Sequence, residues 1–257
     1  MPHSVGRNRP LSLSRRFICD VMHFAQKVPT VPVQRRINVA AVRQARERLT
    51  KKVSWCVLFT KAYGIVCRRF PELRRSYLGF PWPRLYEHPH SIASVAVERQ
   101  YLGENAVFFG HLRRPEDKPL PKLETYLRRY KEAPLDSIGM FRGALLVGRL
   151  IRPLRRLLWW IGLNSTGRMR AHWMGTFGVT VYSGLGAESL HPLSPATTSL
   201  NYGPIDTDGN VNVRIIYDHR VMDGATVARA LAEIDKVMNT EIVQELQELR
   251  YRTGQAA

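Results

Sequence analysis

One histidine and one aspartate stand four residues apart where a strand-like segment gives way to a helix-like one. His219 follows the alternating apolar run 211–216, which predicts a strand, and Asp223 precedes residues 226–234, whose apolar spacing predicts a helix. A histidine at a strand end can act as a general base, because its ordinary pKa lies near neutrality. Spacing alone also allows a loop histidine beside an ordinary helix cap.

Asp223 and Gly224 fit the first turn of the predicted helix. A short carboxylate can accept the amide protons that the first helical turn leaves without partners. Glycine lets the backbone turn tightly at the same point. We therefore expect Asp223 to cap the helix.

Helix-like and strand-like segments alternate along the rest of the chain. Helices are predicted over residues 11–26, 40–49, 53–70 and 120–132, and strands over 31–39, 84–87, 91–98 and 106–111. Segment 53–70 is apolar almost all round, which predicts a buried helix. We expect one α/β domain over residues 11–250, a flexible N-terminal arm at 1–10 and a C-terminal tail at 251–257.

The chain is strongly basic. Its 257 residues include 39 lysines and arginines against 21 acids, a net charge of +18, which favours anionic partners. The basic residues are scattered as arginine pairs, without a single basic run or zinc-finger spacing, so the sequence does not favour nucleic acid.

Cysteine and histidine usage predicts neither disulfides nor a metal site. Cys19, Cys56 and Cys67 are odd in number and lie in apolar surroundings, which predicts free thiols in the core and a cytoplasmic location. His88, His90 and His111 lack an accompanying cysteine or carboxylate pattern, so we expect no metal. The sequence has neither a signal-peptide pattern nor an apolar stretch long enough to span a membrane.

The histidine loop resembles a known active-site signature. Residues 218–225 read Asp-His-Arg-Val-Met-Asp-Gly-Ala, similar to the signature of the dihydrolipoyl acyltransferases of 2-oxo acid dehydrogenase complexes. The pattern His-x-x-x-Asp-Gly also resembles chloramphenicol acetyltransferase and condensation domains. Segments 11–16, 28–33, 69–73 and 175–186 resemble further motifs of the acyltransferase family in the same order. The resemblance implies an α/β chloramphenicol acetyltransferase-like two-layer fold with a large mixed sheet, and a homotrimer with active sites between subunits.

The same resemblance implies roles for single residues. His219 would be the general base, and Ser183 would donate a hydrogen bond to the oxyanion of the tetrahedral intermediate; a plain turn serine is the alternative for Ser183. Asp223 would pair with an arginine in a buried contact that shapes the loop, with Arg15 in the matching position and Arg16 as the fallback.

Two departures from the family alter the expected reaction. The usual lipoyl and peripheral-subunit-binding domains are not expected in the ten residues before the domain, and the segment from Ser183 to His219 is short. We therefore expect a stand-alone acyltransferase without covalent lipoate, which uses coenzyme A in the form of acyl-coenzyme A. The acceptor would be a hydroxyl, amine or thiol on a small molecule or lipid. The alternatives are a non-catalytic trimeric scaffold or a core subunit of a 2-oxo acid dehydrogenase-like complex; charge alone would also suit a basic membrane-surface or nucleic-acid binder.

Residues 140–163 form an unusual basic amphipathic insertion. On a helical wheel one side carries Arg142, Arg149, Arg152 and Arg156 and the other carries Leu146, Val147, Leu150, Ile151, Leu154, Leu157, Leu158 and Ile161. Trp159 and Trp160 add side chains typical of a membrane interface, so the segment predicts peripheral contact with an anionic membrane. A helix that covers the protein's own sheet and points its arginines at water is the alternative. Pro153 is expected to kink the helix or to split it in two.

Overall fold

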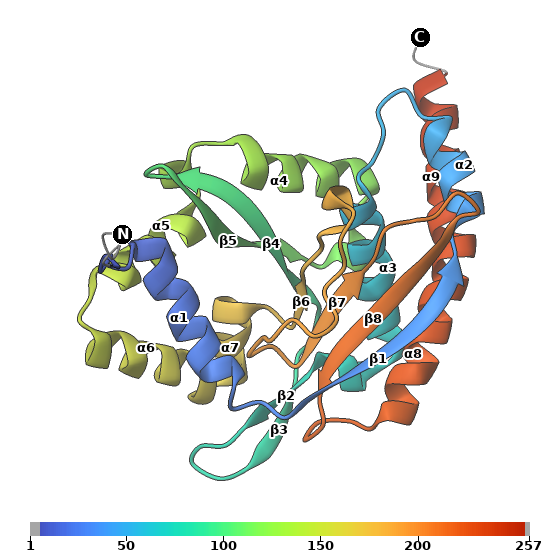
Figure 1. Ribbon diagram of the computed structural model, residues 1–257. Helices are drawn as coiled ribbons and strands as arrows, with labels where there is room; N and C mark the ends of the chain where they lie inside the picture. The colour runs from blue at the N-terminus through green and yellow to red at the C-terminus, as the bar shows by residue number, and fades with distance from the viewer. Residues whose placement is uncertain (1–5, 255–257) are drawn as a thin grey trace, which may run out of the picture.

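A six-stranded mixed sheet forms the centre of the computed structural model, which describes residues 6–254 (Figure 1). Its strands lie in the order β1-β8-β7-β6-β4-β5. They are β1 (Thr30–Asn38), β4 (Ile92–Tyr101), β5 (Glu104–Arg113), β6 (Phe177–Val179), β7 (Thr198–Tyr202) and β8 (Asn210–Asp218). The β4–β6 and β6–β7 pairs are parallel and the other pairs antiparallel. Strand β1 lies at the edge, where Pro32 costs the sheet no donor from an inner ladder.

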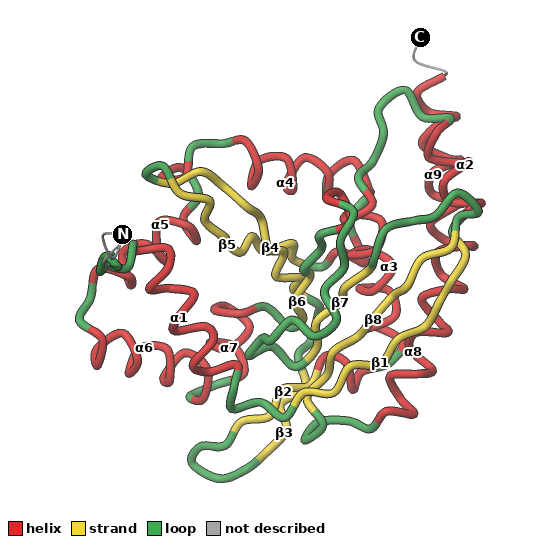
Figure 2. The backbone as a smooth tube through the Cα atoms, viewed as in Figure 1, coloured by secondary structure: helices red, strands yellow, loops and turns green. Residues whose placement is uncertain are grey.

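A second sheet of two short strands projects at one end of the molecule (Figure 2). It pairs β2 (Arg75–Leu78) with β3 (Arg84–Glu87). The sequence predicted β3 but not β2.

One face of the large sheet packs against the principal hydrophobic core. The helices on this side are α2 (Ala40–Glu47), α3 (Trp55–Arg69), α4 (Leu120–Glu132), α8 (Gly224–Val237) and α9 (Val243–Gly254). Helix α3 is buried almost all round, as its composition predicted. Helix α9 continues to Gly254, into the stretch that the sequence assigned to a tail.

The other face of the sheet is partly covered by α1 (Leu13–Ala25), α6 (Arg152–Asn164) and α7 (Gly167–Met174), while α5 (Gly139–Arg149) packs against α1 and β5 and contributes Phe141 to the principal core. Ser12 caps α1, since its hydroxyl accepts a hydrogen bond from the Arg15 amide at 3.3 Å. A smaller apolar cluster joins these helices and contains Val21, Phe24, Trp159, Leu163 and Met174.

The insertion at 140–163 consists of two helices. A split at Pro153 was one of the two expected outcomes. Helix α5 ends at Arg149, and α6 begins at Arg152 with Pro153 in its first turn, where a missing amide proton costs nothing. The expected interfacial role of Trp159 is wrong. Its side chain is 1% exposed and lies 5.4 Å from the ring of Phe17, measured between ring centres.

The side of α6 that faces the protein carries arginine side chains. Asp20 of α1 is fully buried and accepts hydrogen bonds from Arg155 Nε and from Arg156 Nε, the latter at 2.8 Å. Because the buried carboxylate draws these arginines inward, Leu154, at 42% exposure, and Leu157, at 52%, face outward. Neither the membrane-bound helix nor the sheet-covering helix expected from the sequence placed Arg155 in the protein interior.

Candidate active site

The loop that carries His219 is anchored by an ion pair between a buried carboxylate and an exposed arginine. Asp218 is the last residue of β8, and its side chain is fully buried. Its carboxylate accepts hydrogen bonds from Arg220 at the backbone amide (3.0 Å), Nε (2.9 Å) and Nη2 (2.7 Å). The Arg220 guanidinium also lies 4.3 Å from the ring centre of Tyr77. These contacts fix the backbone on both sides of His219.

His219 presents its imidazole at the surface. Its amide donates to the Pro29 carbonyl at 3.1 Å, and its ring lies 5.5 Å from the ring of Tyr217. The side chain is 51% exposed, so a reacting group can approach it. His219 Nδ1 lies 3.8 Å from Asp223 Oδ1, which is beyond hydrogen-bond distance. The loop thus offers a fixed, accessible base.

Asp223 occupies the N-cap position of α8 but does not cap the helix with its side chain. Its backbone carbonyl accepts from the Thr226 amide at 3.1 Å, whereas the carboxylate makes no capping bond and is 86% exposed. The expected side-chain cap is therefore wrong. A Cβ at Gly224 would lie 3.3 Å from the Tyr217 hydroxyl, so glycine leaves room for that ring.

Arg15 does not pair with Asp223 within the chain. It lies in the first turn of α1 and is exposed, at the opposite end of that helix from Ala25 and the His219 loop. Ten residues of helix separate Arg15 from Ala25, or about 15 Å. The fallback, Arg16, donates through Nε to the Leu11 carbonyl instead. The buried pair implied by the resemblance is thus not formed by one copy alone.

Ser183 lies far from His219 in the same chain. It begins a short 3-10 turn after β6, and its side chain hydrogen-bonds that of Tyr202 at the end of β7. Tyr202 pairs with Val213 in β8. His219 follows Val213 by six residues, or about 20 Å of extended strand. In Figure 1 the loop between β8 and α8 accordingly lies at the lower end of the sheet. One chain therefore does not bring the candidate base and the candidate oxyanion donor together.

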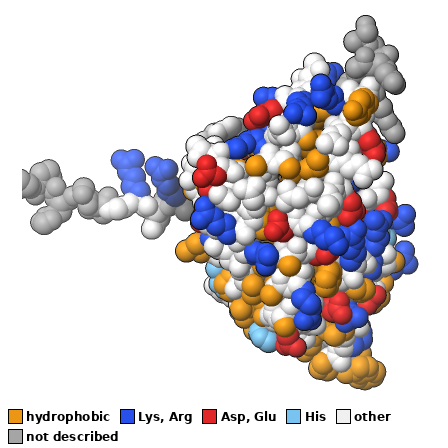
Figure 3. All heavy atoms as spheres, turned by 90° about the vertical axis from the view of Figure 1, so that its right-hand side faces the viewer, with side chains coloured by type: hydrophobic (Ala, Val, Ile, Leu, Met, Phe, Trp, Pro, Cys, Tyr) orange, Lys and Arg blue, Asp and Glu red, His pale blue; other side chains and the backbone are white. Residues whose placement is uncertain are grey.

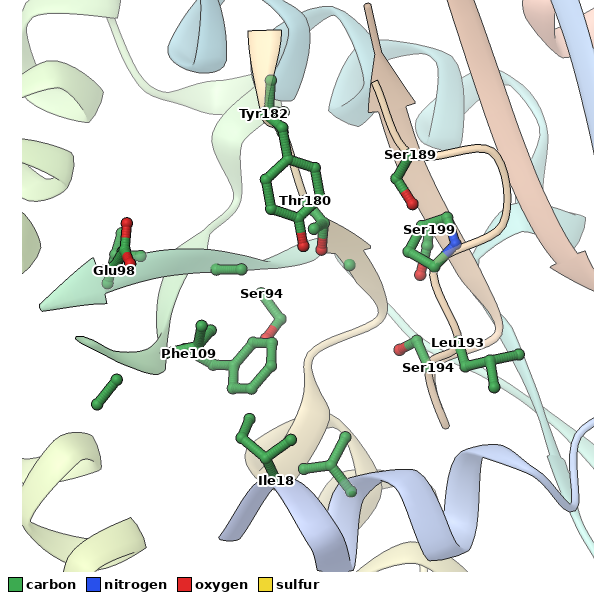
Figure 4. Close-up of a pocket in the computed structure, with 18 of the residues that line it drawn as sticks. Ile18, Ser94, Glu98, Phe109, Thr180, Tyr182, Ser189, Leu193, Ser194 and Ser199 are labelled. Atoms are coloured by element: carbon green, nitrogen blue, oxygen red, sulfur yellow. The ribbon is translucent and has the colours of Figure 1, made fainter. Parts of the chain in front are cut away.

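A chamber of about 740 Å³ lies between α1 and the exposed face of the sheet (Figure 4). Apolar side chains form one part of its wall, and hydroxyl groups form another. The hydroxyls come from Ser94, Thr180, Ser189, Ser194 and Ser199. Ser94 of β4, Gly178 of β6 and Ser199 of β7 are in register across the sheet, so the polar groups follow one row. The sequence did not predict this chamber.

The chamber borders the turn that contains Ser183. Tyr182, Gly184 and Leu185, the residues next to Ser183 in the chain, line it, as does Arg15 on α1. Ser94 Oγ is buried there without a protein partner among the described residues. The chamber thus has Arg15 in its wall and borders the turn of Ser183, which is not itself among the lining residues; His219 and Asp223 lie outside.

His111 stands directly opposite Ser94 on β5 and is 6% exposed. Burial lowers the pKa of its imidazole to about 3, and the neighbouring charge of Arg113 acts in the same direction. His88 makes a separate contact, between its Nε2 and Ser76 Oγ at 2.9 Å. Within residues 6–254, no three histidine, cysteine or acidic side chains are grouped as metal ligands.

The three cysteines are free thiols in the structure. Burial raises the pKa of Cys56 to about 11 and that of Cys67 well above its ordinary value. These two thiols are therefore poor nucleophiles near neutral pH.

Several solved acyltransferase structures are similar to this chain across nearly its whole length, whereas it matches no protein-family model and no curated protein. A probable dihydrolipoamide acetyltransferase from Listeria monocytogenes superposes with a TM-score of 0.65 at 16% identity, covering 94% of this chain and 95% of its own. The dihydrolipoamide acetyltransferase of Azotobacter vinelandii gives 0.67 at 15% identity, with 93% of each chain covered. A chloramphenicol acetyltransferase gives 0.50 at 13% identity, covering 89% and 96%.

At these identities the similarity establishes the fold. The chain has the chloramphenicol acetyltransferase-like α/β fold with a large mixed sheet, shared with the catalytic domains of 2-oxo acid dehydrogenase acyltransferases. The fold expected from the histidine motif is confirmed. The function has to be inferred from the candidate site, because proteins with one fold can have several different activities.

Proposed function

We propose that this protein is an acyltransferase that moves an acyl group from a thioester, most simply acyl-coenzyme A, to a hydroxyl, amine or thiol. The observation that carries the proposal is the His219 loop. An exposed imidazole at a strand end is held by the ion pair between buried Asp218 and Arg220, within a motif that resembles an acyltransferase signature.

The proposed reaction uses His219 as a general base. Its imidazole takes the proton from the acceptor as the acceptor attacks the thioester carbonyl, and a tetrahedral intermediate with an oxyanion forms. The Ser183 hydroxyl donates a hydrogen bond to that oxyanion. The carbon–sulfur bond then breaks, the thiolate leaves, and the proton held by His219 passes to it. No metal takes part in this sequence.

The wide separation of Ser183 and His219 in one chain supports an active site between copies. Sites between subunits are what the resemblance implies for a homotrimer, and a neighbouring copy would bring its His219 loop to the chamber beside Ser183. The same juxtaposition would place Asp223 near Arg15 of the neighbour, which would remove both exposed charges from water as a pair. The Azotobacter vinelandii enzyme was studied for the role of a serine, a histidine and an asparagine in its mechanism, and that asparagine follows the histidine by four residues, the spacing of Asp223 from His219.

The chamber lining favours an uncharged acceptor with both apolar and polar parts. Its wall combines side chains such as Ile18, Val107 and Phe109 with the row of hydroxyls, and Arg15 and Glu98 are its charged members. The phosphates of acyl-coenzyme A suit the positive balance of the chain as a whole.

The proposal is tested by release of free coenzyme A thiol from a series of acyl-coenzyme A donors, with one thiol, one amine and one hydroxyl amphiphile as acceptors. His219→Ala should lower the rate by about 10²–10⁴ with an unchanged melting temperature, because it removes only the base. His172→Ala, an exposed histidine on α7, serves as the matched control and should retain activity.

Two results would oppose the proposal. Equal rates for the parent and His219→Ala would exclude His219 as the base. An absence of acyl transfer with every donor and acceptor, in a protein that still assembles, would favour the non-catalytic scaffold.

A further inference from the structure

Helix α6 exposes an apolar stripe to solvent along its outer side. The stripe consists of Ile151, Leu154, Leu157, Trp160 and Ile161, with exposed fractions between 38% and 70%. These residues cannot turn inward, because Asp20 holds Arg155 and Arg156 on the inner side and Trp159 fills the cluster below. The stripe is therefore a fixed property of how α6 is attached to α1.

The turn between β2 and β3 extends the stripe with two large aromatic side chains. Phe80 is 52% exposed and Trp82 is 71% exposed. The ring of Phe80 lies 5.3 Å from that of Trp160, and Arg84 Nη2 donates to the Ser165 carbonyl at 3.4 Å just beyond α6. These contacts join the turn and the helix into one surface, here named the α6–hairpin surface.

Positive charge predominates in the chain around the α6–hairpin surface, and Glu87 of the hairpin is paired with Arg75. Between Asp136 and Glu188 the sequence contains seven arginines and no acidic residue. Arg149 and Arg152 flank the start of the stripe and are exposed, as is Arg168 at the start of α7. Figure 3 shows a different face of the molecule, over α8 and α9, on which acidic and basic side chains are mixed. Hydrophobic side chains gather at the lower end of this face, where the hairpin lies.

We propose that the α6–hairpin surface binds the surface of an anionic lipid membrane. The exposed leucine, isoleucine and tryptophan side chains would enter the boundary between headgroups and acyl chains, and the arginines would contact the negative headgroups. Tryptophan suits this boundary because its ring is apolar and its indole N–H is polar. Within residues 6–254, no helix is long and apolar enough to cross a membrane.

The charge around the stripe argues against two other occupants. A second copy that used the same surface would bring arginines mainly against arginines, because a two-fold interface pairs like surfaces and Glu87 of the hairpin is already paired with Arg75. Nucleic acid is contacted mainly through phosphate, which calls for basic groups rather than a row of exposed leucine and isoleucine. An anionic bilayer satisfies both the apolar stripe and the flanking arginines.

The test is co-sedimentation of the full protein with vesicles that contain phosphatidylglycerol, compared with vesicles of phosphatidylcholine alone. Binding should be strong to the anionic vesicles at about 0.05 M salt and weaken at about 0.5 M, because salt screens the arginines. The double substitution Leu157→Glu with Trp160→Glu should lower the bound fraction about tenfold or more, since it places carboxylates against the headgroups. Leu102→Glu introduces a carboxylate at a more exposed leucine, in the β4–β5 turn, and should not alter binding.

The molecular mass in solution and the melting temperature are measured for every variant. Unchanged mass and melting, together with lost vesicle binding in the double variant only, would support the proposal. No binding of the parent protein to anionic vesicles at low salt would overturn it. A change in assembly of the double variant without any change in vesicle binding would also overturn it, and would assign the surface to contacts between copies.

Discussion

His111 makes the stability of the fold depend on pH. The burial of its imidazole lowers the pKa from 6.5 to about 3, so the folded protein keeps the ring neutral. Below pH 6.5 the unfolded chain binds a proton that the folded chain does not, and the free energy of unfolding falls as the pH is lowered toward 3. At pH 5 the loss from this one group should be about 2 kcal/mol, as urea unfolding at pH 7.5 and 5 would measure.

His111→Phe should reduce this pH dependence, because it removes the titrating group while filling the site. The control is Ser94→Ala, which alters the residue opposite His111 but leaves the imidazole in place. If His111→Phe and its parent lose the same stability between the two pH values, another group is responsible.

At the scale of single residues, the sequence predicted local structure but not the contacts between residues that lie far apart in the chain. The motif around His219 predicted a histidine loop between a strand and a helix, and the structure has that loop. The anchoring of the loop by Asp218 was not read from the sequence, although Arg220 lies only two residues away. The contact of Ser183 with Tyr202 depends on the fold of the intervening loop, which no local pattern specifies.

The attachment of α6 to α1 depends on one buried carboxylate. Asp20→Ala would leave Arg155, 7% exposed, without its negative partner, and should lower the free energy of unfolding by about 3–5 kcal/mol. Asp117→Ala breaks an exposed pair with Arg68 and should cost less than about 1 kcal/mol. Chemical denaturation of both variants measures the difference; comparable losses would mean that the Asp20 cluster adds little to stability.

Among the elements, long periodic segments were predicted best. The limits of α4 agree with its predicted range, and α3 is the buried helix that its composition indicated. Strand β7 and helix α7 were missed because each is short, and their stabilisation comes from neighbours rather than from their own periodicity. For α6 the wheel separated arginines from leucines correctly but could not tell which side faces inward, because Asp20 lies more than a hundred residues earlier.

At the scale of the whole molecule, a site between copies predicts complementation. His219→Ala and Ser183→Ala should each be nearly inactive alone. For Ser183→Ala the rate of acyl transfer should fall by about 10²–10³, because an oxyanion donor is lost. In trimers formed by co-expressing both variants in equal amounts, roughly one site in four would combine a normal histidine with a neighbour's normal serine. Coenzyme A release should therefore recover to about a quarter of the parent rate.

A mixture that stays as inactive as the two variants alone would mean that both residues act from one chain. That outcome would require a large rearrangement, since about 20 Å of strand separates their positions in a single copy.

The position of β8 between β1 and β7 has a consequence for how the chain is made. Thr30 of β1 pairs with Asp218 of β8, which is synthesised 188 residues later, and β1 has no other neighbour in the described sheet. At typical rates of translation, about 10–40 s pass between the synthesis of β1 and the synthesis of β8. During that interval its backbone donors and acceptors are open to pairing with other chains, and Pro32 interrupts the row of donors. His219 follows β8 directly, so the candidate base reaches its final position only when this last strand closes the sheet.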